Sequence, residues 1–258
     1  MAVHPGSQGL LAVTAGLDRS VAVLDLAKGR LLTKWKYNSR RALAGAAVEP
    51  AAEAEGERDA KRVRVDPAAR ALAAREEPVG VLFSPAGTRL AVYSRVSCVV
   101  YDATTMAAVD GFVMERPQPS QELGCALFVA EDRLLFGDEA GAIRLFEVRA
   151  PGVGPLAGPG PLPTALRVRY PPALQERAQQ LLAAAVDVAA ETRLKNPLRH
   201  TSRIKALCLQ PGASTVFSID ANGVVLALRL DAARGGELEY LTSGNCRGRV
   251  TCMDILSL

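Results

Sequence analysis

Histidine, cysteine and acidic residues are the side chains of this sequence whose types suit acid–base, nucleophilic or metal chemistry. Only two histidines occur, His4 and His200, and they lie far apart along the chain. The five cysteines are scattered, with no Cys-x-x-Cys pair among them. A structural zinc ion takes about four closely spaced Cys or His ligands. We therefore expect neither a metal nor a cofactor, and we interpret the cysteines as small, mostly buried apolar residues.

Acidic pairs are the remaining catalytic candidates. Asp138 and Glu139 are adjacent, but they fall in a predicted hairpin turn, where a solvated turn explains them better than catalysis does. Gly-x-Ser-x-Gly, His-Glu-x-x-His and a phosphate-binding loop ending in Lys-Ser/Thr are all missing. Residues 152–160 are rich in glycine, but the prolines among them lack the N–H groups that would bind a phosphate. The sequence therefore predicts a protein that is not an enzyme.

Composition and charge are those of an ordinary folded protein. Of the 258 residues, 49% are hydrophobic and 22% are charged, so disorder of the whole chain is not expected. The net charge of +4 is too small to indicate nucleic-acid binding by itself. No apolar stretch approaches the roughly 20 residues that cross a bilayer, and the first residues do not resemble a signal peptide. We expect a soluble protein inside the cell, with no membrane partner and no direct nucleic-acid partner.

The same order of short apolar runs occurs four times along the chain. These runs are the elements that would position the polar residues named above. In each unit a first run leads through a turn rich in Gly, Asp or Ser into a second, alternating run. The first runs cover residues 10–14, 89–93, 133–136 and 215–218, and the second runs cover 20–26, 97–103, 142–148 and 224–230. Asp, Asn and Gly favour tight turns, so each unit is predicted to be a β-hairpin, with Asp18 and Asn222 as turn residues.

Further short strands flank these hairpins. The runs before them cover residues 79–83, 123–129 and 203–209, and the runs after them cover 31–37, 107–114 and 237–241. Four strands per unit, repeated along the chain, is the pattern of a propeller blade. A β-sandwich of similar short strands is the alternative, and the repeated order favours the propeller.

Two stretches interrupt this rhythm. Residues 38–77 are rich in Ala, Glu and Arg with poor apolar periodicity, and we predict a flexible insertion. Residues 151–199 begin as a Gly/Pro linker and continue, over 171–194, with apolar residues at helical spacing. We predict one inserted α-helix there, which packs on the outside of the sheets or docks a partner.

One tight basic run lies in the first insertion. Lys61, Arg62 and Arg64 sit within Ala-Lys-Arg-Val-Arg-Val-Asp-Pro, and this run is similar to a monopartite nuclear-import signal. An import receptor reads such a run in extended form, which suits a flexible segment. The alternative is an ordinary solvated basic patch.

Several segments carry a resemblance to a known family when they are taken in chain order. They are His4-Pro5-Gly6, residues 23–30, Phe83-Ser84-Pro85-Ala86-Gly87, residues 99–102, 137–139 and 143–146, His200-Thr201-Ser202-Arg203-Ile204-Lys205 and Arg249-Val250-Thr251-Cys252-Met253. Together they resemble the C-terminal half of the p21-activated-kinase-interacting-protein family of WD-repeat proteins, which includes ribosome-assembly factors. The resemblance covers most of the chain outside the two insertions.

The resemblance implies an all-β fold, a WD-repeat β-propeller of about three and a half blades with one inserted helix and its N-terminal blades missing. It implies a non-catalytic scaffold in the nucleus and nucleolus, where large ribosomal subunits are assembled, with pre-ribosomal proteins or assembly factors as partners. Within the same family, the alternative is a binding regulator that inhibits a p21-activated protein kinase. A further alternative is a protein-interaction propeller of another complex.

The sequence departs from the family pattern in its blade-rigidifying residues. Trp-Asp pairs are missing, and the Trp positions hold Leu24, Tyr101, Phe146 and Leu228. The turn acid is kept at Asp18, is Asn222 in the last unit, and is missing near Ser94. His200 is expected to cap the last unit through a local hydrogen bond. Because of these departures, we expect the His, hydroxyl, Asp and Trp network that rigidifies the family's blades to be weak in this chain.

Overall fold

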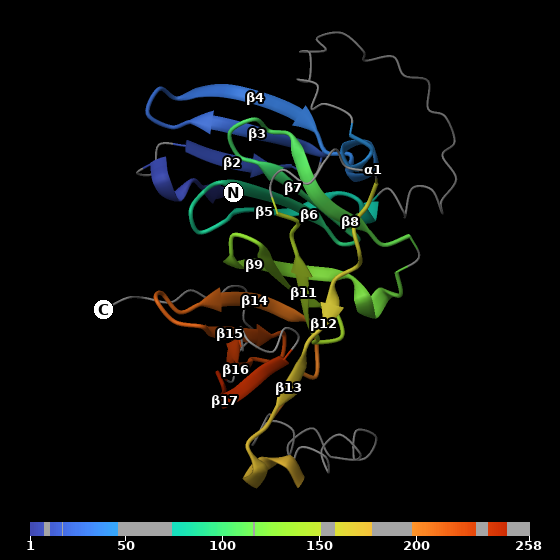
Figure 1. The fold of residues 1–258 in the computed structure, drawn as a ribbon, viewed down its shortest axis with the longest axis vertical. Coiled ribbons are helices and arrows are strands. Elements are labelled where there is room, and N and C mark those ends of the chain that lie inside the picture. Colours follow the sequence, from blue (N-terminus) through green and yellow to red (C-terminus); the bar gives the residue numbers. More distant parts are fainter. Residues whose placement is uncertain are drawn as a thin grey trace. The chain divides into compact units, whose positions relative to one another are not determined.

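The computed structural model describes residues 1–7, 11–16, 18–45, 74–115, 117–150, 158–176, 198–230 and 237–246. These residues form an all-β fold, as the sequence predicts, and the helices among them are short (Figure 1). Within the described part of the chain, no helix is long and apolar enough to span a membrane.

Two four-stranded antiparallel sheets form the first part of the chain. Sheet A contains β1 (Ala2–Val3), β2 (Leu11–Ala15), β3 (Ser20–Asp25) and β4 (Arg30–Lys36). Sheet B contains β5 (Pro78–Phe83), β6 (Arg89–Ser94), β7 (Ser97–Asp102) and β8 (Ala108–Val113). In both sheets the strands lie in chain order, so each sheet is a simple meander.

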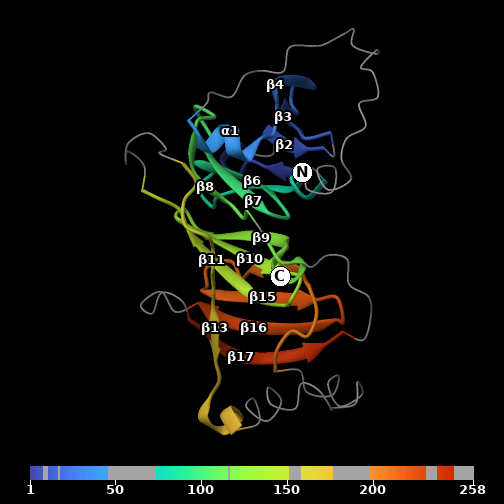
Figure 2. The ribbon, with the colours of Figure 1, turned by 90° about the vertical axis from the view of Figure 1, so that its right-hand side faces the viewer.

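Two further sheets form the second part. Sheet C contains β9 (Leu123–Ala130), β10 (Arg133–Asp138), β11 (Ile143–Glu147) and β12 (Thr164–Ala165). Sheet D contains β13 (Arg167–Arg169), β14 (Ile204–Leu209), β15 (Thr215–Asp220), β16 (Val224–Leu230) and β17 (Glu237–Asn245). Strands β14 to β17 form another meander, of which Figure 2 shows β15, β16 and β17 side by side, and β13 is added parallel to β17.

The predicted strand runs are confirmed to within a few residues, but the predicted count of about three and a half units is too low. Four meanders are present among the described residues, because β1 completes the first and β12 completes the third. Both strands are two residues long, which is too short for an alternating apolar pattern to appear in the sequence.

The chain divides into two compact units, each with a core of its own. Unit 1 comprises residues 1–117, 130–133 and 147–162, and unit 2 comprises residues 118–129, 134–146 and 163–258. The core of unit 1 joins sheets A and B through Val13, Val21, Val23, Trp35, Tyr37, Ala42, Leu43, Val81, Leu90, Val92, Val99, Tyr101 and Val113. Strand β6 is buried along its whole length, which explains its near-continuous apolar sequence.

The core of unit 2 joins sheets C and D. Its buried members are Cys125, Leu135, Ile143, Leu145, Leu166, Leu198, Ile204, Leu207, Val216, Val224, Leu226, Leu228, Leu238 and Tyr240. Leu228, at one of the predicted Trp positions, is fully buried in this core. An aliphatic residue therefore fills that position by packing alone, without the indole N–H of tryptophan.

The first residues of the predicted insertion 38–77 form a helix, which corrects the expectation of a flexible segment there. Helix α1 (Ser39–Leu43) begins at Asn38, whose side chain accepts a hydrogen bond of 2.9 Å from the Arg41 N–H. Leu43 is fully buried and α1 contacts β7 and β8. A helix of five residues is too short to show apolar periodicity in the sequence.

The second predicted insertion, residues 151–199, is described only in part. Residues 158–163 are irregular, residues 164–169 contain β12 and β13, and residues 172–176 are helical. The rest of the predicted helix, residues 177–194, lies outside the described residues, as do residues 46–73 of the first insertion.

Candidate functional site

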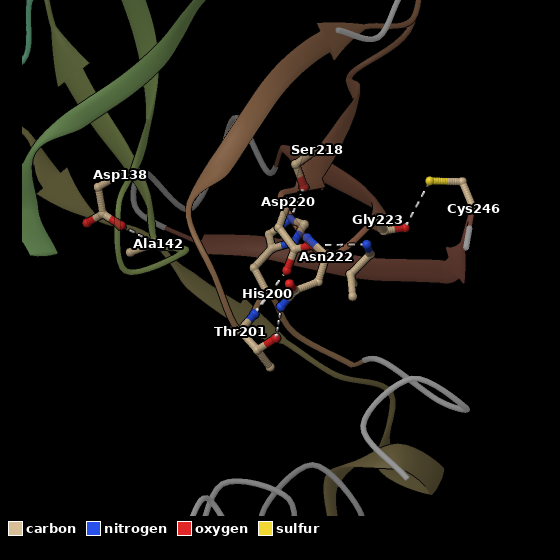
Figure 3. Close-up of polar contacts among 10 residues, drawn as sticks. Asp138, Ala142, His200, Thr201, Ser218, Asp220, Asn222, Gly223 and Cys246 are labelled. Carbon is tan, nitrogen blue, oxygen red and sulfur yellow. Dashed lines mark hydrogen bonds and ion pairs between the residues drawn. The ribbon is translucent and has the colours of Figure 1, made fainter. Parts of the chain in front are cut away.

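The hairpin turn between β15 and β16 holds a buried group of polar side chains (Figure 3). His200 lies just before β14, Ser218 lies in β15, and Asp220 is the last residue of β15. The His200 Nε2 atom is 2.7 Å from Ser218 Oγ, and its Nδ1 atom faces Asp220 Oδ2 at 3.6 Å. Ser218 and Asp220 are both 0% exposed. The predicted cap at His200 is therefore part of a network of three side chains.

The Asp220 carboxylate closes this turn through backbone N–H groups. Its Oδ1 atom accepts hydrogen bonds of 2.9 Å from Asn222 and from Val224, and its Oδ2 atom accepts one of 3.2 Å from Thr201. Burial acts to raise the pKa of the Asp220 carboxyl, but the facing His200 and the backbone donors hold this pKa below its ordinary value. The charged carboxylate therefore fixes both the turn and the segment that enters β14.

Asn222 lies beside this network, but its side chain does not accept the hydrogen bonds of the turn's backbone N–H groups. Its backbone N–H donates to Asp220, and its side-chain Nδ2 donates to Thr201 Oγ1 at 3.2 Å. The turn carboxylate that sequence reasoning sought at Asn222 is therefore Asp220, two residues earlier. The signal that would have found it is Ser-x-Asp at the end of the first run, with a histidine upstream.

Serine, histidine and aspartate are also the residue types of hydrolase catalytic triads. A nucleophilic serine must reach a substrate carbonyl, whereas Ser218 is fully buried between β14 and β16. The Asp220 oxygens are also occupied by backbone donors. This arrangement is suited to holding a turn rigid, and it offers no reaction site in the present conformation.

The matching turn of sheet C is built around Asp138. Its Oδ1 atom accepts hydrogen bonds from the Ala140 and Ala142 N–H groups at 3.0 and 2.7 Å, and Arg144 Nε donates to Oδ2 at 2.9 Å. Asp138 is fully buried, which corrects the expectation that the acidic pair at this turn is solvated. Gly141 in this turn has φ +86°, and a Cβ there would lie 2.8 Å from the Ser202 backbone oxygen. The turn at Asp138 therefore packs against the segment that enters β14. Figure 3 shows Asp138 and Ala142 together with the residues of the His200 network.

The matching turn of sheet B uses hydroxyl groups instead of a carboxylate. Ser94 Oγ accepts hydrogen bonds from the Val96 and Ser97 N–H groups at 3.2 and 3.0 Å. Ser97 Oγ lies 2.8 Å from Ser94 Oγ and 3.0 Å from the hydroxyl of Tyr37. Burial raises the pKa of Tyr37 well above its ordinary value, so this hydroxyl stays neutral. The turn that lacks an acid is thus closed by an uncharged network.

The turn of sheet A contains the predicted residue Asp18. Its Oδ1 atom accepts hydrogen bonds from the N–H and the hydroxyl of Ser20 at 3.1 and 2.5 Å, and Lys36 Nζ lies 3.1 Å from its Oδ2 atom. Hydrogen bonds from Ser20, together with the Lys36 ammonium, hold the pKa of Asp18 well below its ordinary value. The side chain is 55% exposed, unlike those of Asp138 and Asp220.

Replacing Asp18 with Ala should therefore have a small effect. We expect the free energy of unfolding to fall by less than about 1 kcal/mol, because water screens the ion pair and replaces part of the hydrogen bonding. The midpoint of urea denaturation measures this change, and Asp18→Asn, which keeps an acceptor oxygen, is the control. If Asp18→Ala lowers the free energy of unfolding as much as loss of a buried turn acid such as Asp220, the turn at Asp18 is not solvated.

A second kind of turn, which links β5 to β6, binds the acid Glu131, and both the turn and Glu131 belong to unit 1. Glu131 accepts hydrogen bonds from Ser84 Oγ at 2.7 Å, from the Ala86 N–H at 2.6 Å, and from Thr88 Oγ1. Burial acts to raise the pKa of Glu131, but these three hydrogen bonds hold it below its ordinary value. On the same turn, His4 Nε2 lies 3.0 Å from the Gly87 carbonyl oxygen. Both histidines of the sequence therefore hold turns in place.

The cysteines and the import signal complete the predicted set. Cys98 and Cys125 are buried, and burial raises the pKa of the Cys125 thiol to about 12. Within the described part of the chain, no group of three His, Cys, Asp or Glu residues is placed to hold a metal ion. Lys61, Arg62 and Arg64 lie outside the described residues.

Comparison with known proteins assigns no family, because neither a family model nor a curated protein matches the sequence. The function is therefore inferred from the residues and the fold.

Proposed function

We propose that this protein is a non-catalytic WD-repeat scaffold whose sheets are blades of a β-propeller. The four meanders, each with its strands in chain order, support this proposal. The network of His200, Ser218 and Asp220 carries it, because a histidine before the first strand, a hydroxyl in the second and an acid at the next turn are the blade-rigidifying residues of the family. Only its tryptophan is replaced, by Leu228.

The scaffold works in assembly of the large ribosomal subunit in the nucleus and nucleolus. The segments that resemble this family's ribosome-assembly factors support that role, and several of them occupy structural positions in the turns. His200 and Thr201 hold the turn of sheet D, and Ser84 and Gly87 bind Glu131 and His4 in unit 1. The partners are then pre-ribosomal proteins or assembly factors, which bind exposed strands and loops.

The test is sedimentation of a tagged chain from a cell extract through a sucrose gradient. We expect the chain to travel with particles that contain the large-subunit rRNA precursor, and to leave these fractions when the precursor is degraded by ribonuclease. Co-purification with a p21-activated kinase in place of these particles would assign the chain to kinase regulation. Absence from both would assign it to another complex.

Nuclear entry has a separate test at Lys61 and Arg62. Removing two cations from a three-cation run should strongly weaken receptor binding, since the receptor reads the run through its charges. We expect Lys61→Ala with Arg62→Ala to move a fluorescent fusion from the nucleus to the cytoplasm at unchanged abundance. The matched control is Arg167→Ala with Arg169→Ala, which removes two exposed cations that lie outside the import run. An unchanged nuclear signal would show that Lys61 and Arg62 are not read by an import receptor.

A further inference from the structure

The outermost long strands of three sheets each receive an added piece of chain. All three pieces come from one continuous stretch, residues 158–169, which we call the edge segment. The Gly160 N–H donates to the Gly111 oxygen of β8 at 2.6 Å, β12 pairs with β11, and β13 pairs with β17. Main-chain pairing along a sheet edge is thus a contact this protein makes repeatedly.

Strand β4 is the outermost strand of sheet A, and within the described residues it pairs with β3 alone (Figure 1). The Tyr37 N–H donates to the Arg19 oxygen at 2.6 Å, just beyond the end of the β3–β4 pairing. Antiparallel pairing alternates, so the backbone groups of Trp35 and Thr33 also face β3. Those of Lys34 and Lys36 therefore face outward, where an added strand would bond them.

Large apolar side chains are exposed along this edge. Leu31 is 50% exposed and Leu32 is 44% exposed, both in β4, and Leu26 in the preceding turn is 46% exposed. Edge strands of soluble proteins usually avoid such exposed leucines, because they invite pairing with another chain. Their presence indicates that this edge is covered by a partner.

Positive charge decides which partner the edge can accept. Lys28, Arg30, Lys34 and Lys36 lie on the turn and strand that form this edge. Asp25 offsets Lys28 and Arg30 through contacts of 3.9 and 3.7 Å, and Asp18 offsets Lys36, whereas Lys34 makes no ion pair in the described structure. A second copy of the chain would bring the same cations to the same edge and be repelled. A segment rich in Asp or Glu would be attracted.

We propose that the outer edge of β4 binds an extended acidic segment of a partner protein as an added β-strand. The backbone of Lys34 and Lys36 forms the main-chain hydrogen bonds, Leu31 and Leu32 contact apolar side chains of the segment, and its carboxylates face the cations. This inference rests on the proposed role as a binding scaffold and adds the place and chemistry of one contact.

Fluorescence anisotropy with a labelled peptide of alternating Glu and Val tests this contact on the full chain, with alternating Lys and Val as the charge control. We expect the acidic peptide to bind the chain and the basic peptide not to bind. Binding of the acidic peptide should weaken as salt is added. Lys34→Pro removes the outward N–H without removing a bond to β3, so it should weaken binding about tenfold, equivalent to one or two hydrogen bonds. Lys34→Ala, which keeps the N–H, should weaken it by only about two- to threefold.

A second variant protects the test against a folding defect of Lys34→Pro. Lys34→Glu keeps the backbone N–H and reverses the charge, and we also expect it to weaken binding about tenfold. Thermal melts of both variants should match the wild-type chain. Equal binding of the acidic peptide to wild-type chain and both variants, no binding to the wild-type chain, or equal binding of the basic peptide would each overturn the proposal.

The sedimentation result separates this proposal from the scaffold role. If the chain travels with pre-ribosomal particles and the edge variants bind the acidic peptide normally, the edge proposal fails and the role in assembly stands. If the chain binds the acidic peptide through β4 but never travels with those particles, the edge proposal stands and the role in assembly fails.

Discussion

Replacing Asp220 with Ala is expected to lower the free energy of unfolding by about 3 kcal/mol or more. The substitution leaves the N–H groups of Thr201, Asn222 and Val224 without their acceptor, and it removes the acid that faces His200. The Val224 contact is buried, and a buried donor left unpaired costs about 1–3 kcal/mol, whereas the Thr201 and Asn222 contacts are only part-buried and cost less. Urea denaturation followed by circular dichroism measures the change.

The matched control is Asn222→Ala, which removes only the side-chain contact with Thr201 and should cost less than about 1 kcal/mol. Comparable losses for the two variants would show that Asp220 does not hold the turn. A wild-type-like melt of Asp220→Ala would remove the main structural support for the WD-repeat proposal.

The role of Asp220 can also be tested by the dependence of the free energy of unfolding on pH. The pKa of Asp220 is lower in the folded chain than its ordinary value of 3.8, so its carboxylate stabilises the fold above that pH. This contribution is lost as the pH falls through the lower, folded-state pKa. Asp220→Asn should therefore reduce the dependence of stability on pH below about 4 while keeping the size of the side chain. An unchanged dependence would contradict the lowered pKa.

Gly111→Ala is expected to destabilise unit 1 by about 3 kcal/mol or more. Gly111 has φ +154°, and a Cβ at this position would lie 2.3 Å from the Cys98 backbone oxygen and 2.9 Å from Leu43 Cδ2. The first neighbour belongs to the paired strand β7, so it cannot move away without breaking the pairing of β7 and β8. The midpoint of thermal unfolding measures this loss.

Gly244 provides the matched control, because an added Cβ there meets nothing within 4 Å. Gly244→Ala should change the free energy of unfolding by no more than about 0.5 kcal/mol. If Gly111→Ala melts like Gly244→Ala, the close approach of β7 and β8 at Gly111 is wrong.

Periodicity predicted the long strands well, because each contains several apolar or β-branched residues in a row. Strand β7, for example, reads Ser-Cys-Val-Val-Tyr-Asp and was predicted over residues 97–103. Strands β1, β12 and β13 have two or three residues each and are held by main-chain pairing, so side-chain patterns carry no signal for them. Helix α1 was missed for the same reason, since one turn shows no period.

The polar turns were predicted less completely than the strands. Asp18 is expected in a turn from its residue type and His200 is expected to cap the last unit, but the turn position of the acid is assigned to Asn222 when Asp220 fills it. Both residues suit a turn, and only the register of β15 and β16 decides which one points inward. Contacts between residues far apart in the sequence, such as Glu131 with Ser84, lie beyond any local pattern.

The edge segment also has a consequence for motion. Strands β12 and β13 are separated by Leu166 alone, which is buried in the core of unit 2 and donates its N–H to the Ile143 oxygen at 2.8 Å. Tyr170, just after β13, is tied down by a hydrogen bond of 2.7 Å from its hydroxyl to the Leu198 oxygen. Neither strand can peel away while Leu166 stays in the core, so the two open together as one cooperative patch of local unfolding. We therefore expect solvent to reach the edges of β11 and β17 together, once Leu166 has left the core and the Tyr170 hydroxyl has released the Leu198 oxygen.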